Sequence, residues 1–340
     1  MPDTSIIDQP WPAKELEHIK RCPYCNSNDR TLAYKDVQDW SFYCAPGKWN
    51  YWNCSQCEAL YLSPRPTELS IGKAYSKYYT HNSKGKTLTE NIKNRLKNEC
   101  FSHWLNSNIT PRINLLKSLS FLLNPLKKML HMPFELELLL DLPKGELLDV
   151  GCGSGYMLKI AKEMGWDVTG LEIDPLAVKA AREKGLNVIQ GDYRKLDQFL
   201  NIYDCIICSH VLEHVHHPLM LLKLLVKALR PQGVLFLSLP NAHSHVRERF
   251  GENWRGIEAP RHVAIPTVKK IIEHLNSLGC TAISQSDIYG ITIPESARIK
   301  AKKSCLSRLN FIYLKLKFAP TSKGLDTQSD FIQLTVRKGR

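Results

Sequence analysis

The stretch Leu147-Leu148-Asp149-Val150-Gly151-Cys152-Gly153-Ser154-Gly155 decides the fold, because an apolar run leads directly into a glycine-rich turn. We expect a β-strand over residues 146–150 and, from the apolar spacing after the turn, a helix over residues 155–164. Glycines let the backbone of such a turn come close to a ligand, and the free N–H groups at the start of a helix attract an anion. The stretch therefore predicts a ligand site where the strand ends.

Apolar runs and helical patterns continue to alternate after this turn. Apolar strands joined by helices are typical of a mostly parallel sheet that is covered on both faces. The sequence therefore predicts an α/β, doubly wound, mostly parallel seven-stranded sheet. Its strands are expected at 146–150, 167–172, 187–190, 203–208, 233–239, 281–287 and 331–337, and its helices at 155–164, 175–184, 218–229 and 267–278.

The spacing of the glycines distinguishes between two kinds of nucleotide site. Dinucleotide-binding turns prefer G-x-G-x-x-G, whereas Gly155 comes one position early and Tyr156 stands where the third glycine would fall. The turn, with the strand before it, resembles the first motif of the class I S-adenosylmethionine-dependent methyltransferases. The resemblance implies that family's fold and S-adenosyl-L-methionine as the cofactor.

Further matches to this family follow in the family's order. Glu172 matches the acidic residue that contacts the ribose hydroxyls, Asp192 the residue that contacts the adenine, and Asp149 the residue that orients the methionine end. Each of these side chains alone could simply cap a helix or a turn, but the set in this order is specific. The resemblance implies a cofactor site composed of Asp149, Gly151, Gly153, Gly155, Glu172, Asp192 and Ser209.

Two later segments resemble motifs of one subgroup of this family. Residues 208–218, Cys-Ser-His-Val-Leu-Glu-His-Val-His-His-Pro, and residues 230–233, Arg-Pro-Gln-Gly, resemble motifs of the bacterial subgroup related to the ubiquinone-pathway O-methyltransferases. Residues 254–263 resemble a segment found after the fifth strand in many polysaccharide-cluster methyltransferases. The resemblance covers roughly 141–287. The sequence departs from the family in Gln232, where glycine is common, and in a long loop at about 288–330.

Three histidines are candidates for the chemistry. Methyl transfer is an in-line displacement that often needs a base for the acceptor's proton, and histidine suits that task at neutral pH. His214 and His262 are the first candidates and His210 the third, although each could be a hydrogen-bonded structural residue. His210-x-x-Glu213-His214 also matches the H-x-x-E-H pattern of inverted zinc proteases. The pattern follows a methyltransferase strand here, which argues against a protease. The binding of a divalent metal ion by this cluster of acid and histidine side chains is a minor alternative.

Two cysteine pairs predict a structural zinc site. Cys22 and Cys25 form one C-x-x-C pair and Cys54 and Cys57 the other, with 28 residues between the pairs. This spacing fits a closed tetrahedral four-thiolate site, and zinc would replace the core that so short a module cannot build. Unligated reduced thiols are the alternative. Cys44 is a spare ligand.

The net charge of +13 is concentrated in two segments. Residues 84–131 contain nine Lys or Arg against two Glu, and residues 298–317 contain seven Lys or Arg and no acid. Such charge points to RNA, an anionic membrane surface or a phosphate-bearing substrate, unless the segments are solvated helix faces. Leucines on one helical face over 112–132 predict an amphipathic linker or cap.

The chain is expected to have three parts. These are a zinc-ribbon-like module at 18–66, a basic helical linker or cap at 67–140, and a methyltransferase domain at 141–340 with an inserted basic segment at about 288–330. No signal peptide or membrane-spanning run is recognisable, and eleven cysteines fit thiols or metal ligands better than disulfides. A cytoplasmic location, or one peripheral to the membrane, is therefore expected.

The leading functional hypothesis is O-methylation of a small-molecule, glycan or lipid-linked acceptor. An RNA methyltransferase is the first alternative, because some ribosomal RNA guanine methyltransferases also have a zinc module before this fold and the charge suits a phosphate backbone. A non-catalytic scaffold protein that binds the cofactor is the second alternative. The complete glycine turn, together with Glu172 and Asp192, argues against it.

Overall fold

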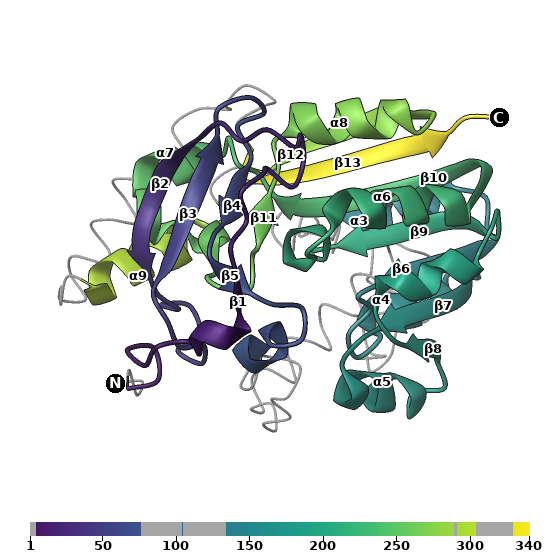
Figure 1. The fold of residues 1–340 in the computed structure, drawn as a ribbon. Coiled ribbons are helices and arrows are strands. Elements are labelled where there is room, and N and C mark those ends of the chain that lie inside the picture. Colours follow the sequence, from purple (N-terminus) through teal and green to yellow (C-terminus); the bar gives the residue numbers. More distant parts are fainter. Residues whose placement is uncertain (1–4, 76–103, 105–133, 289–290, 304–328) are drawn as a thin grey trace. The chain divides into compact units, whose positions relative to one another are not determined.

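The computed structural model of the chain describes residues 5–75, 104, 134–288, 291–303 and 329–340 (Figure 1). The chain divides into two compact units. Unit 1 contains residues 1–79, 208–227 and 234–340, and unit 2 contains residues 80–207 and 228–233. The domain boundaries expected at 18–66, 67–140 and 141–340 stay a prediction, since most of 67–140 lies outside the described residues.

A seven-stranded sheet has the order β12-β13-β10-β9-β6-β7-β8. Strand β7 is parallel to β6 and to β8, whereas β13 is antiparallel to β10 and β12. The order reverses between β6 and β9, which is the switch point where open α/β sheets bind ligands. The predicted seven-stranded, mostly parallel sheet is confirmed. Its strands are β6 (Glu146–Val150), β7 (Asp167–Glu172), β8 (Asn187–Gln190), β9 (Tyr203–Ser209), β10 (Leu229–Pro240), β12 (Cys280–Ile288) and β13 (Phe331–Lys338).

Three helices of unit 2 accompany its strands: α3 (Phe134–Asp141), α4 (Tyr156–Glu163) and α5 (Pro175–Arg182). Helix α5 begins after Asp174, whose side chain accepts the N–H of Leu176, and its first residue is a proline that has no N–H to satisfy. Ala177, Val178 and Ala181 form its buried face. These small side chains let the helix pack closely.

Unit 1 contains the helices that follow β9. Helix α8 begins where the Thr267 side chain accepts the N–H of Lys270, and it lies along β12 and β13 (Figure 1). Helix α9 lies between β12 and β13, within the region at about 288–330 where the sequence analysis expected a long loop. The helices after β9 are α6 (Pro218–Ala228), α7 (His245–Phe250), α8 (Val268–Ser277) and α9 (Ile293–Lys303).

The N-terminal strands of unit 1 form a second sheet, with the order β11-β4-β3-β2. Strand β11 comes from the C-terminal half of the chain, where Ala264 pairs with Tyr61 and Ile265 with Leu60. Buried tryptophans at 11, 49 and 254 join both parts in one core, so the N-terminal segment folds onto residues about two hundred positions away. The strands are β2 (Arg30–Val37), β3 (Trp49–Cys54), β4 (Leu60–Leu62) and β11 (Ala264–Ile265), and β1 (Leu16–Glu17) pairs separately with β5 (Arg65–Pro66).

Short 3-10 helices connect these elements. They are η1 (Ala13–Glu15), η2 (Ile71–Tyr75), η5 (Tyr193–Gln198), η6 (Leu212–His214), η7 (Gly251–Asn253) and η8 (Arg255–Ile257). The amphipathic helix expected at 112–132 lies outside the described residues. Within the described ranges, no helix is both long enough and apolar enough to cross a bilayer.

Candidate active site

The glycine turn after β6 has the backbone conformation that only glycine adopts readily. Gly151, Gly153 and Gly155 lie at φ +76°, +53° and +77°, in the left-handed region. A Cβ on Gly155 would come within 2.4 Å of Leu186 Cδ1 and 3.2 Å of Ala181 Cβ, whereas a Cβ on Gly153 would meet nothing within 4 Å. Gly155 is therefore required by packing, and Gly153 faces open space that a ligand can enter.

Glu172, at the end of β7, holds this turn in place. Its side chain is buried, Oε2 accepts the N–H of Gly153 at 2.8 Å and Oε1 accepts the N–H of Asp174 at 2.9 Å. Each carboxylate oxygen has a second lone pair, so both can accept a further hydrogen bond. The predicted contact with ribose hydroxyls is compatible with this arrangement and stays a prediction.

Asp149, in β6, is a buried carboxyl group close to other carboxylates. It is 5% exposed, and burial, with the negative charges of Glu135 and Glu172, raises its pKa to about 7. A positive charge beside Asp149 would favour the ionised carboxylate. The residues therefore fit the cationic methionine end of S-adenosyl-L-methionine, the group that the resemblance assigns to Asp149.

For the remaining predicted cofactor residues, Asp192 and Ser209, the contact with the cofactor stays a prediction. Asp192 is the N-cap of η5, where Oδ1 accepts the N–H of Arg194 at 2.8 Å, so it has a capping role whether or not it contacts adenine. Ser209 is the last residue of β9 and belongs to unit 1; its cofactor contact stays a prediction. Ile173, which was not singled out from the sequence, is 66% exposed directly after Glu172. Only its place directly after Glu172 in the sequence could have indicated that it lies next to the cofactor site.

A cluster of acid and histidine side chains follows β9. Glu213, His214 and His262 place their ligand atoms within 4.8 Å of one another. Glu213 is fully buried; Oε1 lies 3.3 Å from His210 Nδ1, and Oε2 has no hydrogen-bond partner among the described residues. The main-chain N–H of Val263 donates to the Glu213 carbonyl at 2.8 Å. This bond brings His262 beside a motif that is about fifty residues earlier in the chain.

The two leading histidine candidates have different surroundings. The ring centroids of His214 and His262 are 4.6 Å apart. His262 Nδ1 lies 2.7 Å from the Gly256 carbonyl, and burial lowers the pKa of His262 to about 4 even though Glu258 raises it. His262 is therefore a weak base at neutral pH.

His214 is better suited to act as the base. Its Nδ1 lies 3.1 Å from the Arg261 carbonyl and 3.0 Å from the Tyr75 hydroxyl. The carbonyl can only accept, so the hydrogen belongs on Nδ1 and Nε2 keeps its lone pair. The ring is partly exposed. His210, the third candidate, has a half-exposed side chain. Its ring lies edge-on against the ring of Phe331, with the two ring centroids 5.1 Å apart.

The comparison with known families agrees with this geometry. A family model described as "Methyltransferase domain" matches residues 114–285. The chain belongs to this methyltransferase family. The matched range contains the glycine turn, Glu172 and all three histidines, and it ends before α9.

Curated relatives share part of this methyltransferase domain. The Ubiquinone biosynthesis O-methyltransferase of Xanthomonas oryzae pv. oryzae (strain PXO99A) is 36% identical over 109 residues, which are 30% of this chain and 46% of that protein. The protein of the same name from Idiomarina loihiensis is 35% identical over 126 residues, 35% of this chain and 49% of its own length. The chain spans about half the length of the curated relatives it matches.

Solved structures are also similar to the chain. A SAM dependent methyltransferase from Archaeoglobus fulgidus is 20% identical, with a TM-score of 0.39 over 57% of this chain and 86% of that chain. An S-adenosylmethionine dependent methyltransferase from Mesorhizobium loti is 19% identical, with a TM-score of 0.41 over 61% of this chain and 98% of that chain.

An ion-pair network that reaches beyond the matched range supports the position of His214. Arg261 is fully buried; Nη2 lies 2.5 Å from Asp39 Oδ1, Nη1 lies 3.1 Å from Asp39 Oδ2, and Nε donates to Glu258 Oε1 at 3.1 Å. The Arg261 carbonyl is the partner of His214 Nδ1. Asp39 and Tyr75 thus act on the histidine from the N-terminal part of unit 1, and nothing in their local sequence indicates it.

The four predicted zinc ligands lie together. The Sγ atoms of Cys22 and Cys57 are 3.5 Å apart, those of Cys25 and Cys54 are 3.4 Å apart, and all four lie within 4.8 Å of one another. Zn–S bonds in a tetrahedron place sulfur atoms about 3.8 Å apart, so the group fits zinc with little adjustment. The cluster lies outside the range that matches the methyltransferase family.

The backbone of the two cysteine pairs also suits a metal, and a metal would offset the raised pKa of a thiol there. The N–H of Asn26 donates to the Cys22 carbonyl, and the N–H of Glu58 donates to the Cys54 carbonyl, so both pairs form the same turn. Burial, together with the neighbouring thiols of Cys54 and Cys57, raises the pKa of Cys25 to about 11. A divalent cation would reverse this shift, because it stabilises thiolates.

The spare cysteine, Cys44, is held elsewhere. Its Sγ lies 3.4 Å from the Ala74 carbonyl and 3.6 Å from Asp39 Oδ2, and it is absent from the cysteine cluster.

Proposed function

We propose that the chain is an S-adenosyl-L-methionine-dependent methyltransferase that methylates an oxygen atom of a small-molecule, glycan or lipid-linked acceptor. The observation that carries this proposal is the turn after β6 with its two buried carboxylates. Gly153 leaves space for a ligand, Glu172 fixes the turn, and Asp149 lies where a cation would stabilise it. Membership of the methyltransferase family gives this site its function.

The residues of the chain have distinct parts in the reaction. The cofactor, when bound, supplies an electrophilic methyl group to the acceptor. Asp149, Glu172 and the glycine turn would hold the cofactor, with Asp192 and Ser209 as further contacts that the family resemblance implies. His214 would accept the acceptor's proton on Nε2, and its ring is fixed through Nδ1 by Tyr75 and the Arg261 carbonyl. Fixed orientation lowers the entropy that a displacement reaction loses.

We assign a structural zinc ion to Cys22, Cys25, Cys54 and Cys57. Four thiolates leave no coordination position for a substrate. The Sγ separations and the matching turns support the site, and zinc would stabilise the N-terminal sheet, whose strand β2 leads into the segment with Asp39. The metal would thus contribute to catalysis only through the position of Arg261 and His214.

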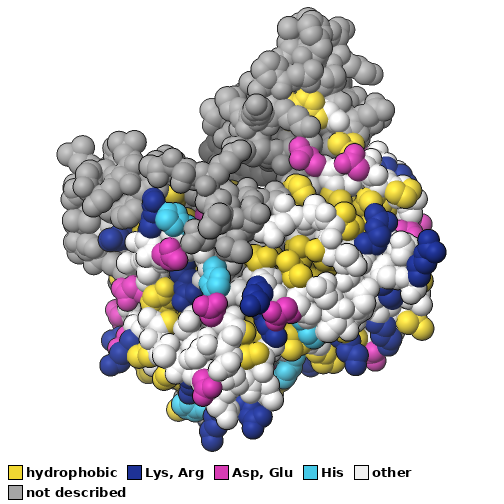
Figure 2. Space-filling model, turned by 90° about the horizontal axis from the view of Figure 1, so that it is seen from above, with side chains coloured by type: hydrophobic (Ala, Val, Ile, Leu, Met, Phe, Trp, Pro, Cys, Tyr) yellow, Lys and Arg dark blue, Asp and Glu magenta, His cyan; other side chains and the backbone are white. Residues whose placement is uncertain are grey.

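An RNA methyltransferase remains the second candidate because of the charge. Outside residues 84–131 and 298–317, which carry +7 each, the rest of the chain has a net charge of −1. On the face that Figure 2 shows, Lys and Arg among the described residues are interspersed with Asp and Glu. RNA, or an anionic membrane surface, would therefore contact the two basic segments rather than the described part of this face.

Transfer of labelled methyl groups tests the proposal. The protein is incubated with methyl-labelled S-adenosyl-L-methionine and a fractionated lysate of its source, and the label is measured in small molecules, glycans, lipids, RNA and protein. The Gly153→Val variant is the control, and the label measured with it gives the background from methyltransferases of the lysate. Label in small molecules, glycans or lipids supports the proposal, label in RNA supports the second candidate, and no label above the control in any fraction contradicts both.

A further inference from the structure

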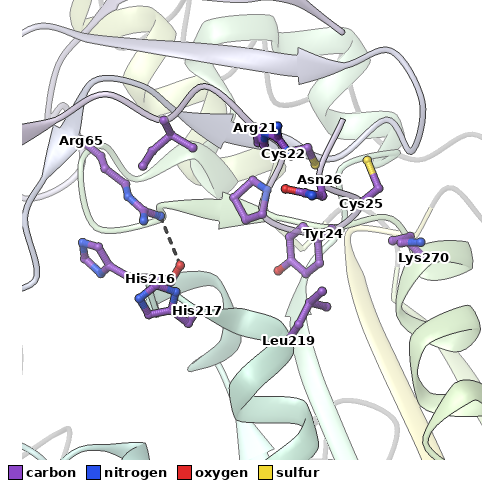
Figure 3. A pocket seen from close by; sticks show the side chains of 12 residues that line it. Arg21, Cys22, Tyr24, Cys25, Asn26, Arg65, His216, His217, Leu219 and Lys270 are labelled. Carbon is purple, nitrogen blue, oxygen red and sulfur yellow. Dashed lines mark hydrogen bonds between the residues drawn. The ribbon is translucent and has the colours of Figure 1, made fainter. Parts of the chain in front are cut away.

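A cavity of about 600 Å³ lies in unit 1 beside the cysteine cluster (Figure 3). This volume is in the range of small-molecule sites. Its walls come from the segment before β2, from β5, from the start of α6 and from α8. Figure 3 shows Arg65 at one end and Lys270 at the other, with Tyr24 between them. We call it the Arg65–Lys270 cavity.

The lining of this cavity contains five basic side chains beside Cys22 and Cys25 of the cysteine cluster. Arg21, Arg65 and Lys270 line it, together with His216 and His217, and no Asp or Glu is among the lining residues. The Arg21 side chain forms no hydrogen bond or ion pair with any residue that the structure describes. Glu17, Glu68 and Glu273 pair with Arg65, His217 and Lys270 from outside the lining, so Arg21 and the unpaired edge of Arg65 are the positive groups most open to an entering anion.

Arg65 is the buried charged side chain of this cavity. Its side chain is 5% exposed; Nε donates to Glu17 Oε1 at 2.8 Å and Nη1 donates to the His216 carbonyl at 3.4 Å. Its Nη2 donates to none of the described residues, so one edge of the guanidinium keeps free donors. Burial lowers the pKa of Arg65, and a bound anion would compensate for the lost solvation.

The first turn of α6 adds a main-chain donor. This helix has eleven residues and starts at Pro218, and Leu219 lines the cavity. The N–H of Leu221 donates to the His217 carbonyl, whereas the N–H of Leu219 donates to no described residue. Free N–H groups at a helix start favour an anion, and here they reinforce the cationic side chains.

We propose that the Arg65–Lys270 cavity binds the phosphoryl part of a phosphorylated small molecule, and that this molecule is the methyl acceptor. The second half rests on the proposed function. A phosphoryl group suits the cavity better than one carboxylate, because its several oxygens can engage the fork of an arginine and further cations together.

The position of the cavity along the chain suits an acceptor site. His216 follows His214 by two residues, and two residues of extended chain span about 7 Å at most. A small molecule with its phosphoryl group beside His216 therefore needs only an ordinary length to bring a hydroxyl near His214. The acceptor would be anchored at one end and methylated toward the other.

Titration of the full chain with pyrophosphate tests the cavity. The variant Arg21→Gln/Lys270→Gln removes two cations whose side chains are exposed or partly exposed, and Lys14→Gln/Lys269→Gln removes two exposed cations that do not line the cavity. We expect wild type and the Lys14→Gln/Lys269→Gln control to bind pyrophosphate equally, and the cavity variant to bind it at least about tenfold more weakly. Uridine diphosphate should compete with pyrophosphate, and uridine should not.

Two further measurements separate the alternatives. Zinc content and affinity for S-adenosylhomocysteine are determined for all three proteins, and both should be the same. Equal pyrophosphate affinity in all three overturns the proposal, and so does a cavity variant that loses zinc but binds pyrophosphate like wild type, because the cations then serve the cysteine cluster. If the cavity variant loses pyrophosphate but wild type does not bind S-adenosylhomocysteine, the cavity is an anion site, and both the acceptor assignment and the proposed function fail.

Discussion

Replacement of Asp39 tests whether the N-terminal part of unit 1 supports the histidine site. The Asp39 side chain is 1% exposed, and its carboxylate accepts the main-chain N–H groups of Phe42, Cys44 and Ala45 besides both terminal nitrogens of Arg261. Asp39→Asn removes the negative charge and turns one acceptor into a donor. Arg261 would then remain buried without its bidentate partner.

The cost can be estimated from the remaining contacts. Loss of one partner of a buried ion pair destabilises a protein by about 3–5 kcal/mol. Glu258 still accepts from Arg261 Nε at 3.1 Å, so we expect the lower value, about 3 kcal/mol. Since about 1.4 kcal/mol is a factor of ten, the ratio of folded to unfolded protein should fall roughly 150-fold.

Urea unfolding, followed by tryptophan fluorescence, measures this change, because Trp49 and Trp254 lie in the core that Asp39 adjoins. Asp36→Asn is the matched control. Asp36 is exposed, and its φ of 55° is one that asparagine tolerates, so this variant should stay within about 0.5 kcal/mol of wild type. If Asp39→Asn changes the free energy of unfolding no more than Asp36→Asn does, the network does not hold unit 1 together.

Three further predictions concern the metal and pH. Purified protein should contain about one zinc ion per chain, and elemental analysis should show that Cys54→Ser or treatment with a strong chelator removes it while S-adenosylhomocysteine still binds. Because the pKa of Asp149 is raised to about 7, calorimetry should show that affinity for S-adenosyl-L-methionine rises with pH up to that value and then levels off, at most about tenfold per pH unit; Asp149→Asn should bind weakly at every pH, and the exposed control Asp167→Asn should behave as wild type. Because the pKa of His262 is lowered from 6.5 to about 4, the unfolded chain binds more protons between these values, so the free energy of unfolding should fall as the pH drops through that window. Urea unfolding of His262→Gln should show a weaker pH dependence there, and an identical dependence would contradict the assigned environment.

Features that depend on local pattern could be predicted from the sequence. The sheet followed from continuous apolar runs, and the turn at residues 151–155 followed from glycines at positions that proved to need a left-handed backbone. The cysteine cluster followed from the spacing of two pairs, since each C-x-x-C closes its own turn. In each case the interactions that fix the structure lie within a few residues or repeat with a regular period.

Features that depend on distant partners could not be predicted. Strand β11 has two residues, too few to show a period, yet it pairs the N-terminal sheet with the segment that carries His262. Asp39 and Arg261 are 222 residues apart in the sequence, and nothing in the sequence around either residue indicates that the two form an ion pair. Helix α9 is polar and has a proline near its start, so it shows no clear apolar stripe.

Binding of S-adenosylhomocysteine to a pair of glycine variants tests the central claim most directly. Gly153 and Gly185 have φ of +53° and +73°, and a Cβ on either would meet nothing within 4 Å, so valine imposes the same kind of backbone strain at both positions. Only Gly153 belongs to the turn after β6. Calorimetric titration should show that wild type and Gly185→Val bind S-adenosylhomocysteine with similar affinity and that Gly153→Val binds none. Absence of binding to wild type, or equal binding by the folded Gly153→Val variant, would contradict the assignment of this turn as the cofactor site.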